Sequence, residues 1–283
     1  MARPGISVSI TTLVENSAGD HKSLSPEHGV SFLIKSGDEQ IIFDTGQSER
    51  FLRNAAFLGE DPAKRVSTVV LSHGHYDHTG GLTHLLSATE QRVSIHVGKG
   101  FFEPKYSVSG PALEYVGNRL GRAQIQAAGH RVVEHDTDVT EVADGVFLVT
   151  NFERLRDPDW LNPRFVIPGP SGFQTDHFND EVSVVVKTSR GNVLLVGCSH
   201  PGILNIIESV RARFEEPLYA VLGGTHLIEA SGSRLHNAIG ALSELKDTLL
   251  GMSHCTGDTA MKRLAEVAPH YFHNHTGSTL MIG

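Results

Sequence analysis

Side chains that can bind a metal ion are concentrated within six consecutive residues of the chain: His73, His75, Asp77 and His78. An apolar run, residues 69–71, precedes them, and a glycine pair that can open a helix follows. Alternate residues of a chain leaving a strand point to the same side, so His73, His75 and Asp77 can converge. His78 then faces a neighbouring point. Imidazoles packed this closely favour a positive ion between them, so the loop predicts parts of two adjacent metal sites.

Other apolar runs also end in a hydroxyl residue followed by histidine, as the run before His73 does. The histidines at these later positions are His200, His226 and His254. Active sites of strand–helix folds gather at the carboxyl ends of strands, so we expect all of them at one edge of the fold. The expected arrangement has one metal between His73, His75 and His200, and a second between Asp77, His78 and His254.

Metal-bound water is the chemistry that such a site could perform. Two ions ~4 Å apart can share a water, lower its pKa towards ~7 and contact the attacking and leaving oxygens of an ester. We expect two divalent ions, zinc first, with manganese or iron as alternatives, because zinc accepts imidazole and carboxylate ligands and leaves a position open for water. Asp77 and His226 are the expected catalytic residues. His226 either ligates a metal or holds a substrate oxyanion, a role for which His28 is the alternative.

The elements that must position these residues repeat along the chain. A strand is expected at about 6–14, and each half contains an apolar hairpin followed by a loop and a helix. The hairpins are 30–35 with 40–43, and 182–187 with 193–196; the helices are about 48–58 and 203–213. Two such halves packed sheet to sheet predict a four-layer αββα sandwich of the α/β class. We expect one domain, 1–283, with similar halves at roughly 1–140 and 141–283.

Asp44 ends the first hairpin. It can hold a ligand imidazole through the other ring N–H, or it can simply cap the turn of Asp44-Thr45-Gly46. Residues 98–130 and 150–180 are rich in Gly, Pro, Phe and Asp. We interpret them as long irregular loops that form a lid over the substrate pocket.

Composition narrows the function classes. The formal net charge is -8, and no basic run is present, which argues against a nucleic-acid partner. The two cysteines, Cys198 and Cys255, do not form a disulfide framework of the secreted type. No apolar run reaches membrane-span length and no signal core follows Met1, so we expect a cytoplasmic protein with no membrane partner and a small-molecule substrate. The oligomeric state is left open.

The pattern His73-x-His75-x-Asp77-His78, with Asp44 upstream and strand-end histidines downstream, resembles the metallo-β-lactamase superfamily over essentially the whole length. The resemblance implies the αββα sandwich and a two-metal site, usually zinc. The stretches 197–203, 223–227 and 254–257 are similar to a subfamily named for dihydropterin-ribofuranosylaminobenzene phosphate synthases. The resemblance therefore implies a pterin-related substrate as one possibility.

One departure concerns the ligand set. Much of the superfamily has a metal-bridging Gly-Asp step after the second hairpin, whereas here Cys198 follows Gly197. Either Cys198 or His200 takes that position, or one metal is held more weakly. We expect a dinuclear metal-dependent hydrolase or phosphoester-processing enzyme acting on a small phosphorylated or ester metabolite. The alternatives are a non-catalytic metabolite-binding or sensor protein on the same fold, and an iron redox protein that uses Cys198.

Overall fold

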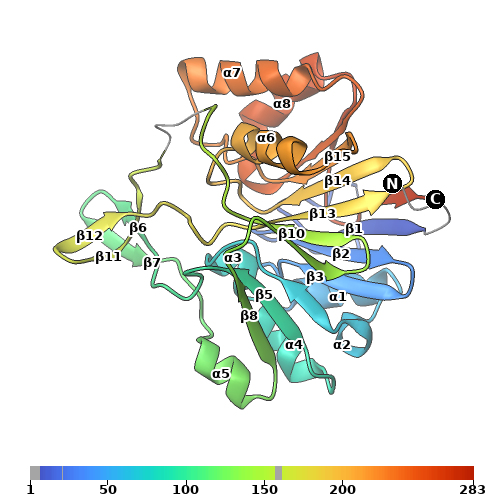
Figure 1. Ribbon diagram of the computed structural model, residues 1–283, viewed down its shortest axis with the longest axis vertical. Coiled ribbons are helices and arrows are strands. Elements are labelled where there is room, and N and C mark those ends of the chain that lie inside the picture. The colour runs from blue at the N-terminus through green and yellow to red at the C-terminus, as the bar shows by residue number, and fades with distance from the viewer. Residues whose placement is uncertain (1–6, 21, 157–160) are drawn as a thin grey trace.

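The computed structural model describes residues 7–20, 22–156 and 161–283. Two seven-stranded sheets lie face to face at its centre (Figure 1). The first has the order β18 (Thr279–Ile282), β1 (Val8–Val14), β2 (Ser31–Ser36), β3 (Glu39–Phe43), β4 (Thr68–Val70), β5 (Ser94–Gly98) and β8 (Arg131–His135). The second has the order β9 (Val139–Ala143), β10 (Val146–Val149), β13 (Ser183–Thr188), β14 (Gly191–Val196), β15 (Leu218–Gly223), β16 (Leu249–Met252) and β17 (Tyr271–His273).

Both sheets have the same sequence of strand pairings. From β18 to β3, and from β9 to β14, neighbouring strands are antiparallel; from β3 to β8, and from β14 to β17, they are parallel. The expected hairpins are β2–β3 and β13–β14, which occupy equivalent places. The C-terminal strand β18 returns to the first sheet. The division of one domain into halves near residue 140 stays a prediction.

Strands that are buried on both faces build the layers. In β13, Val184 and Val186 pack between the sheets, while Val185 faces the helices of the second sheet. This alternation explains why the strand is apolar at every one of these positions. Helices α6 (Ile203–Arg213), α7 (Gly232–Ser243) and α8 (Asp258–Val267) cover the second sheet, and α1 (Arg50–Phe57), α2 (Pro62–Arg65) and α4 (Leu82–Ala88) cover the first (Figure 1). The predicted αββα sandwich is confirmed.

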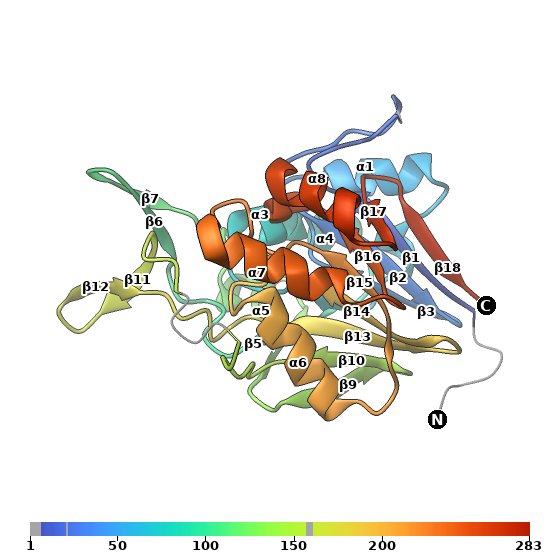
Figure 2. The same cartoon turned by 90° about the horizontal axis from the view of Figure 1, so that it is seen from above.

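The prediction of irregular loops at 98–130 and 150–180 was wrong in part, because regular elements interrupt both segments. They contain α5 (Arg122–Ala127) and a third sheet of order β12-β11-β6-β7, which projects from the body on the side away from the C-terminus (Figures 1 and 2). Its strands are β6 (Tyr106–Ser109), β7 (Ala112–Tyr115), β11 (Phe165–Gly169) and β12 (Gly172–Thr175). These strands are short and β7 is exposed at every residue, so they lack the apolar alternation that reveals a strand in a sequence. Residues 157–160 of the second loop lie outside the described residues.

Among the residues that the structure describes, no helix has the length and apolar character needed to cross a bilayer. The expected cytoplasmic location stays a prediction.

Candidate metal centre

Loops from the carboxyl ends of β4, β14, β15 and β16 meet at one edge of the two central sheets. The approach is close: a methyl group on Gly197 would lie 2.2 Å from Ser72 Oγ, and one on Gly224 would lie 2.5 Å from Cys255 Sγ. Glycine at 197 therefore lets loops of the two sheets touch, and glycine at 224 lets two neighbouring loops of the second sheet touch. The short helix α3 (Tyr76–Thr79) continues the first loop and carries Asp77 and His78.

Strained backbone is concentrated at this edge. Within the described part of the chain, the non-glycine residues with left-handed φ angles are Asp44, Asn151, Phe178, Ser199, His226 and His254. All except Asn151 belong to the loops around the centre. Such conformations cost of order 1–3 kcal/mol each and persist where the surrounding structure holds them, which is common at functional sites.

Three buried imidazoles form the first group, which we call the His cluster: His73, His75 and His200. Their ligand atoms lie within 4.8 Å of one another. The Nε2 atom of each is buried and has no hydrogen-bond partner among the described residues. Leaving a buried polar atom unpaired costs about 1–3 kcal/mol. An ion between the three nitrogens would satisfy all of them at once, and three imidazoles with one open position fit a catalytic zinc ion.

The second group, the mixed cluster, consists of Asp77, His78, Cys198 and His254. Cys198 Sγ lies 3.2 Å from His78 Nε2 and 3.4 Å from His254 Nε2. Asp77 Oδ2 lies 3.7 Å and 3.4 Å from the same two nitrogens. Tetrahedral coordination with zinc–ligand bonds of 2.0–2.3 Å separates the ligand atoms by roughly 3.3–3.8 Å. The donor set therefore fits such an ion. It includes Cys198, which was predicted only as an alternative ligand.

Asp44 determines which imidazole nitrogens face the clusters. Its Oδ2 atom lies 2.6 Å from His78 Nδ1 and also accepts a 2.7 Å hydrogen bond from Ser72 Oγ. Because the Ser72 hydrogen is directed to Asp44, Ser72 Oγ accepts from His73 Nδ1 at 2.9 Å. His73 and His78 thus carry hydrogen on Nδ1 and turn Nε2 towards the two clusters. The structure thus places Asp44 beside the imidazole of His78 and the hydroxyl of Ser72, and its role towards a metal ion stays a prediction.

His254 is oriented in the same way from another direction. Asn16 Oδ1 lies 3.0 Å from His254 Nδ1, and an amide oxygen can only accept, so Nε2 again faces the mixed cluster. Glu15 Oε2 accepts a hydrogen bond from the His254 backbone N–H at 3.1 Å.

Burial and neighbouring charges shift the pKa values of the His cluster and of His78 in opposite directions. Burial is the main cause that holds the pKa values of His73, His75 and His200 well below the ordinary histidine value. These imidazoles are therefore neutral and able to bind metal at physiological pH. Burial also lowers the pKa of His78, but Asp44 and Asp77 outweigh it and raise that pKa to about 9. An ion in the mixed cluster must therefore displace a proton.

A cavity of about 760 Å³ opens onto both clusters. His226 lines it, with a buried Nδ1 that lacks a partner within the described residues and a ring centroid 4.4 Å from that of His200. Burial lowers the His226 pKa to about 4. His28 also lines the cavity, and its Nε2 lies 3.1 Å from Asp77 Oδ2. Both histidines thus lie beside the metal-binding groups without belonging to either.

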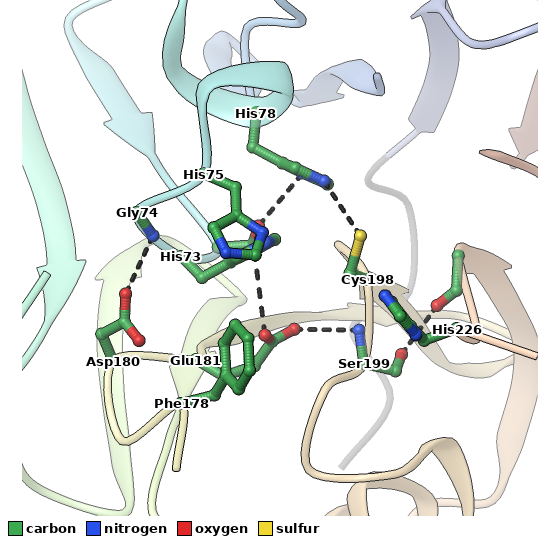
Figure 3. A network of polar contacts seen from close by, with 12 residues as sticks. His73, Gly74, His75, His78, Phe178, Asp180, Glu181, Cys198, Ser199 and His226 are labelled. Carbon is green, nitrogen blue, oxygen red and sulfur yellow. Dashed lines mark hydrogen bonds and ion pairs between the residues drawn. The ribbon is translucent and has the colours of Figure 1, made fainter. Parts of the chain in front are cut away.

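Two side chains that hold the loops of the centre, those of Asp180 and Glu181, were not among the predicted site residues. Glu181 is buried; its Oε1 accepts from the Ser199 N–H at 3.0 Å, and its Oε2 lies 3.7 Å from His73 Nδ1 (Figure 3). Burial raises the pKa of Glu181 well above its ordinary value. Asp180 accepts from the Gly74 N–H at 2.8 Å (Figure 3). The available signal was an Asp-Glu pair directly before a strand that is otherwise apolar.

Comparisons with known proteins agree with this geometry. A model described as the metallo-beta-lactamase superfamily matches residues 24–210. The chain is 30% identical to 7,8-dihydropterin-6-methyl-4-(beta-D-ribofuranosyl)-aminobenzene-5'-phosphate synthase of Methanocaldococcus jannaschii, over 92% of this chain and 91% of the relative. The crystal structure of Tm1679, a metal-dependent hydrolase of the beta-lactamase superfamily, has a TM-score of 0.82, 28% identity and coverage of 96% and 98%. Human tRNase Z, short form, shares the fold with a TM-score of 0.51 and 15% identity over 97% of this chain and 99% of its own. The exclusion of nucleic acid as a partner stays a prediction.

Proposed function

Because the chain belongs to the metallo-β-lactamase superfamily, we propose that it is a dinuclear metal-dependent enzyme that hydrolyses or otherwise processes an ester or phosphoester bond in a small metabolite. The observation that carries the proposal is that three buried Nε2 atoms of the His cluster, which have no hydrogen-bond partner among the described residues, lie beside a complete N₂OS donor set, and that one cavity opens onto both. The His cluster offers three donors and leaves a position open. The mixed cluster offers four.

His73, His75 and His200 would hold one divalent ion, and Asp77, His78, Cys198 and His254 the other. Zinc is the first expectation, because imidazole, carboxylate and thiolate are its preferred ligands. Such ions supply a water of lowered pKa at neutral pH.

The protein's own residues orient the ligands and the substrate. Asp44 and Asn16 fix the ring nitrogens that face the clusters. His226, which lines the cavity and is neutral at pH 7, is placed to hold a substrate oxygen as negative charge develops on it. His28 can contact the same region from the side of Asp77.

The walls of the cavity favour a phosphorylated substrate. Arg164 and Arg119 both line it. Arg164 pairs with Glu229, whereas Arg119 makes no ion pair or hydrogen bond with any residue in the described ranges. A guanidinium without a partner suits a phosphate group. The name of the Methanocaldococcus relative includes a pterin and a 5'-phosphate, which makes a phosphorylated, pterin-related compound the first class to test.

The proposal is tested by counting metal ions in the purified protein by elemental analysis and by screening phosphodiesters, phosphomonoesters and esters with added Zn²⁺ or Mn²⁺. We expect two ions for each chain and turnover of a phosphorylated substrate. A folded wild-type protein that takes up no metal and gains no activity with either ion would refute the proposal.

The alternative function, a metabolite-binding or sensor protein, draws on one specific observation. The mixed cluster has four protein donors, and structural zinc sites are closed in this way, whereas catalytic sites keep an open position. Tight binding of phosphorylated metabolites without turnover by the fully metallated protein would favour this alternative.

A further inference from the structure

A buried lysine lies beside the loop that carries His73 and His75. Lys105 directly precedes β6, and its side chain is 2% exposed. Its Nζ lies 2.6 Å from Asp176 Oδ2 and 2.9 Å from Asp180 Oδ1. Burial lowers the Lys105 pKa, but the two carboxylates outweigh it and raise the pKa above the ordinary value, so the ammonium is charged. Without this cation, two buried carboxylates would face each other.

One arm of this network reaches the loop between two ligands of the His cluster. Asp180 accepts at Oδ2 from the Gly74 N–H at 2.8 Å, and Gly74 separates His73 from His75 (Figure 3). The packing at Gly74 is tight: a methyl group there would lie 2.6 Å from the Phe101 carbonyl oxygen and 3.0 Å from Lys105 Cε. The position of this loop therefore depends on both Asp180 and the lysine stem.

The other arm reaches the third ligand through an aromatic ring. Asp176 Oδ1 accepts from the Phe178 N–H at 2.7 Å and so holds Phe178 in its left-handed conformation, with φ of 50°. The Phe178 ring is stacked on His200, with centroids 3.6 Å apart and planes 9° from parallel. Lys105 Nζ lies 5.0 Å from the centroid of the same ring.

We infer that Lys105 is a positioning residue for the His cluster: through Asp180 it fixes the His73–His75 loop, and through Asp176 and Phe178 it fixes His200. The inference rests on the proposed function, in which this cluster holds an ion. The mixed cluster is oriented by other groups, Asp44 and Asn16. Loss of Lys105 should therefore weaken one metal site and spare the other. Because Lys105 directly precedes β6 of the third sheet, whose residues line the cavity, it also ties that wall to the His cluster.

Cobalt(II) distinguishes the two sites, because only the mixed cluster contains a thiolate that gives a sulfur-to-cobalt charge-transfer band. Metal-free wild-type, Lys105→Met and Lys99→Met proteins are titrated with Co²⁺ while the charge-transfer and d–d bands are followed. Lys99 is a matched control, since its ammonium pairs with Asp136 on the surface. We expect Lys105→Met to weaken Co²⁺ binding at the His cluster about 10- to 100-fold, the usual effect of removing an outer support of a metal ligand. The thiolate band should titrate as in the wild type.

A second variant covers the case in which Lys105→Met does not fold. Phe178→Leu keeps the ion pairs and an apolar side chain but removes the ring stacked on His200, and it should weaken the same site selectively. Unchanged affinity at the His cluster, or equal weakening of both sites, in the folded variants would overturn the inference. If the wild type itself binds no Co²⁺ at the His cluster, the proposed function fails, and the inference fails with it.

Discussion

Replacement of Cys198 by serine tests the assignment that departs most from the superfamily pattern. In the mixed cluster Cys198 Sγ lies between two imidazole nitrogens, 3.2 Å from His78 Nε2 and 3.4 Å from His254 Nε2. A serine hydroxyl stays protonated at neutral pH, so the ligand set loses one of its two negative charges. Removal of a group that only supports a ligand already costs 10- to 100-fold in affinity. We expect removal of the ligand itself to cost at least ~100-fold, or about 3 kcal/mol.

The assay is competition between the protein and a chromophoric zinc chelator, which separates a tight and a weak site by stoichiometry. Wild-type protein should retain two zinc ions against the chelator, and Cys198→Ser should retain one. Cys198→Asp restores an anionic ligand and should recover the second ion.

Cys255→Ser is the matched control. Cys255 is also a buried thiol and lies close by, since its Sγ donates to the Cys198 carbonyl oxygen at 3.5 Å, but it belongs to neither cluster. The serine variant should therefore retain two zinc ions. If Cys198→Ser also retains two with wild-type affinity, the thiol is not a ligand and the four-donor reading of the mixed cluster is wrong.

Further predictions concern the groups around the centre. Asp44→Asn should weaken zinc at the mixed cluster 10- to 100-fold in the same competition assay, because an amide has one acceptor oxygen and cannot replace both carboxylate oxygens, one of which accepts from the Ser72 N–H and the other from His78 Nδ1; unchanged affinity would contradict the orienting role. His226→Ala should lower kcat about 10²- to 10³-fold and leave both zinc ions bound, and loss of an ion would instead make His226 a ligand. Burial, followed by His135, lowers the His96 pKa to about 4, so the unfolded chain takes up a proton there at a higher pH than the folded one. The free energy of unfolding therefore falls as the pH falls from 6.5 towards 4. The His96→Gln variant should remove about 1.5 kcal/mol of the difference in unfolding free energy between pH 7 and pH 5, measured by urea denaturation at each pH. An equal difference in the variant and the wild type would refute this.

The sequence alone predicted those parts of the centre whose metal-binding residue types lie close together in the chain. His73, His75, Asp77 and His78 are neighbours in the chain, so strand and turn geometry alone predicted that the first three can converge and that His78 faces a neighbouring point. His200 and His254 were predicted to lie at strand ends because each follows an apolar run. These inferences needed no knowledge of which loops touch.

The remaining parts of the centre depend on contacts between distant segments. Cys198 joins the mixed cluster because Gly197 packs against Ser72, a contact that no spacing in the chain reveals. Lys105 lies in a region without a clear strand pattern, and its carboxylate partners are more than 70 positions away. Its role became apparent only from the three-dimensional arrangement.

The close approach of Gly197 to Ser72 has a consequence for how the protein assembles. An ion in the mixed cluster takes Asp77 and His78 from the loop after β4, but Cys198 and His254 from loops of the other sheet. Metal binding would therefore act as a reversible cross-link between the two sheets. Since a ligand that binds only the folded state stabilises it in proportion to the logarithm of its free concentration, the supply of that ion would control how firmly the two sheets stay docked.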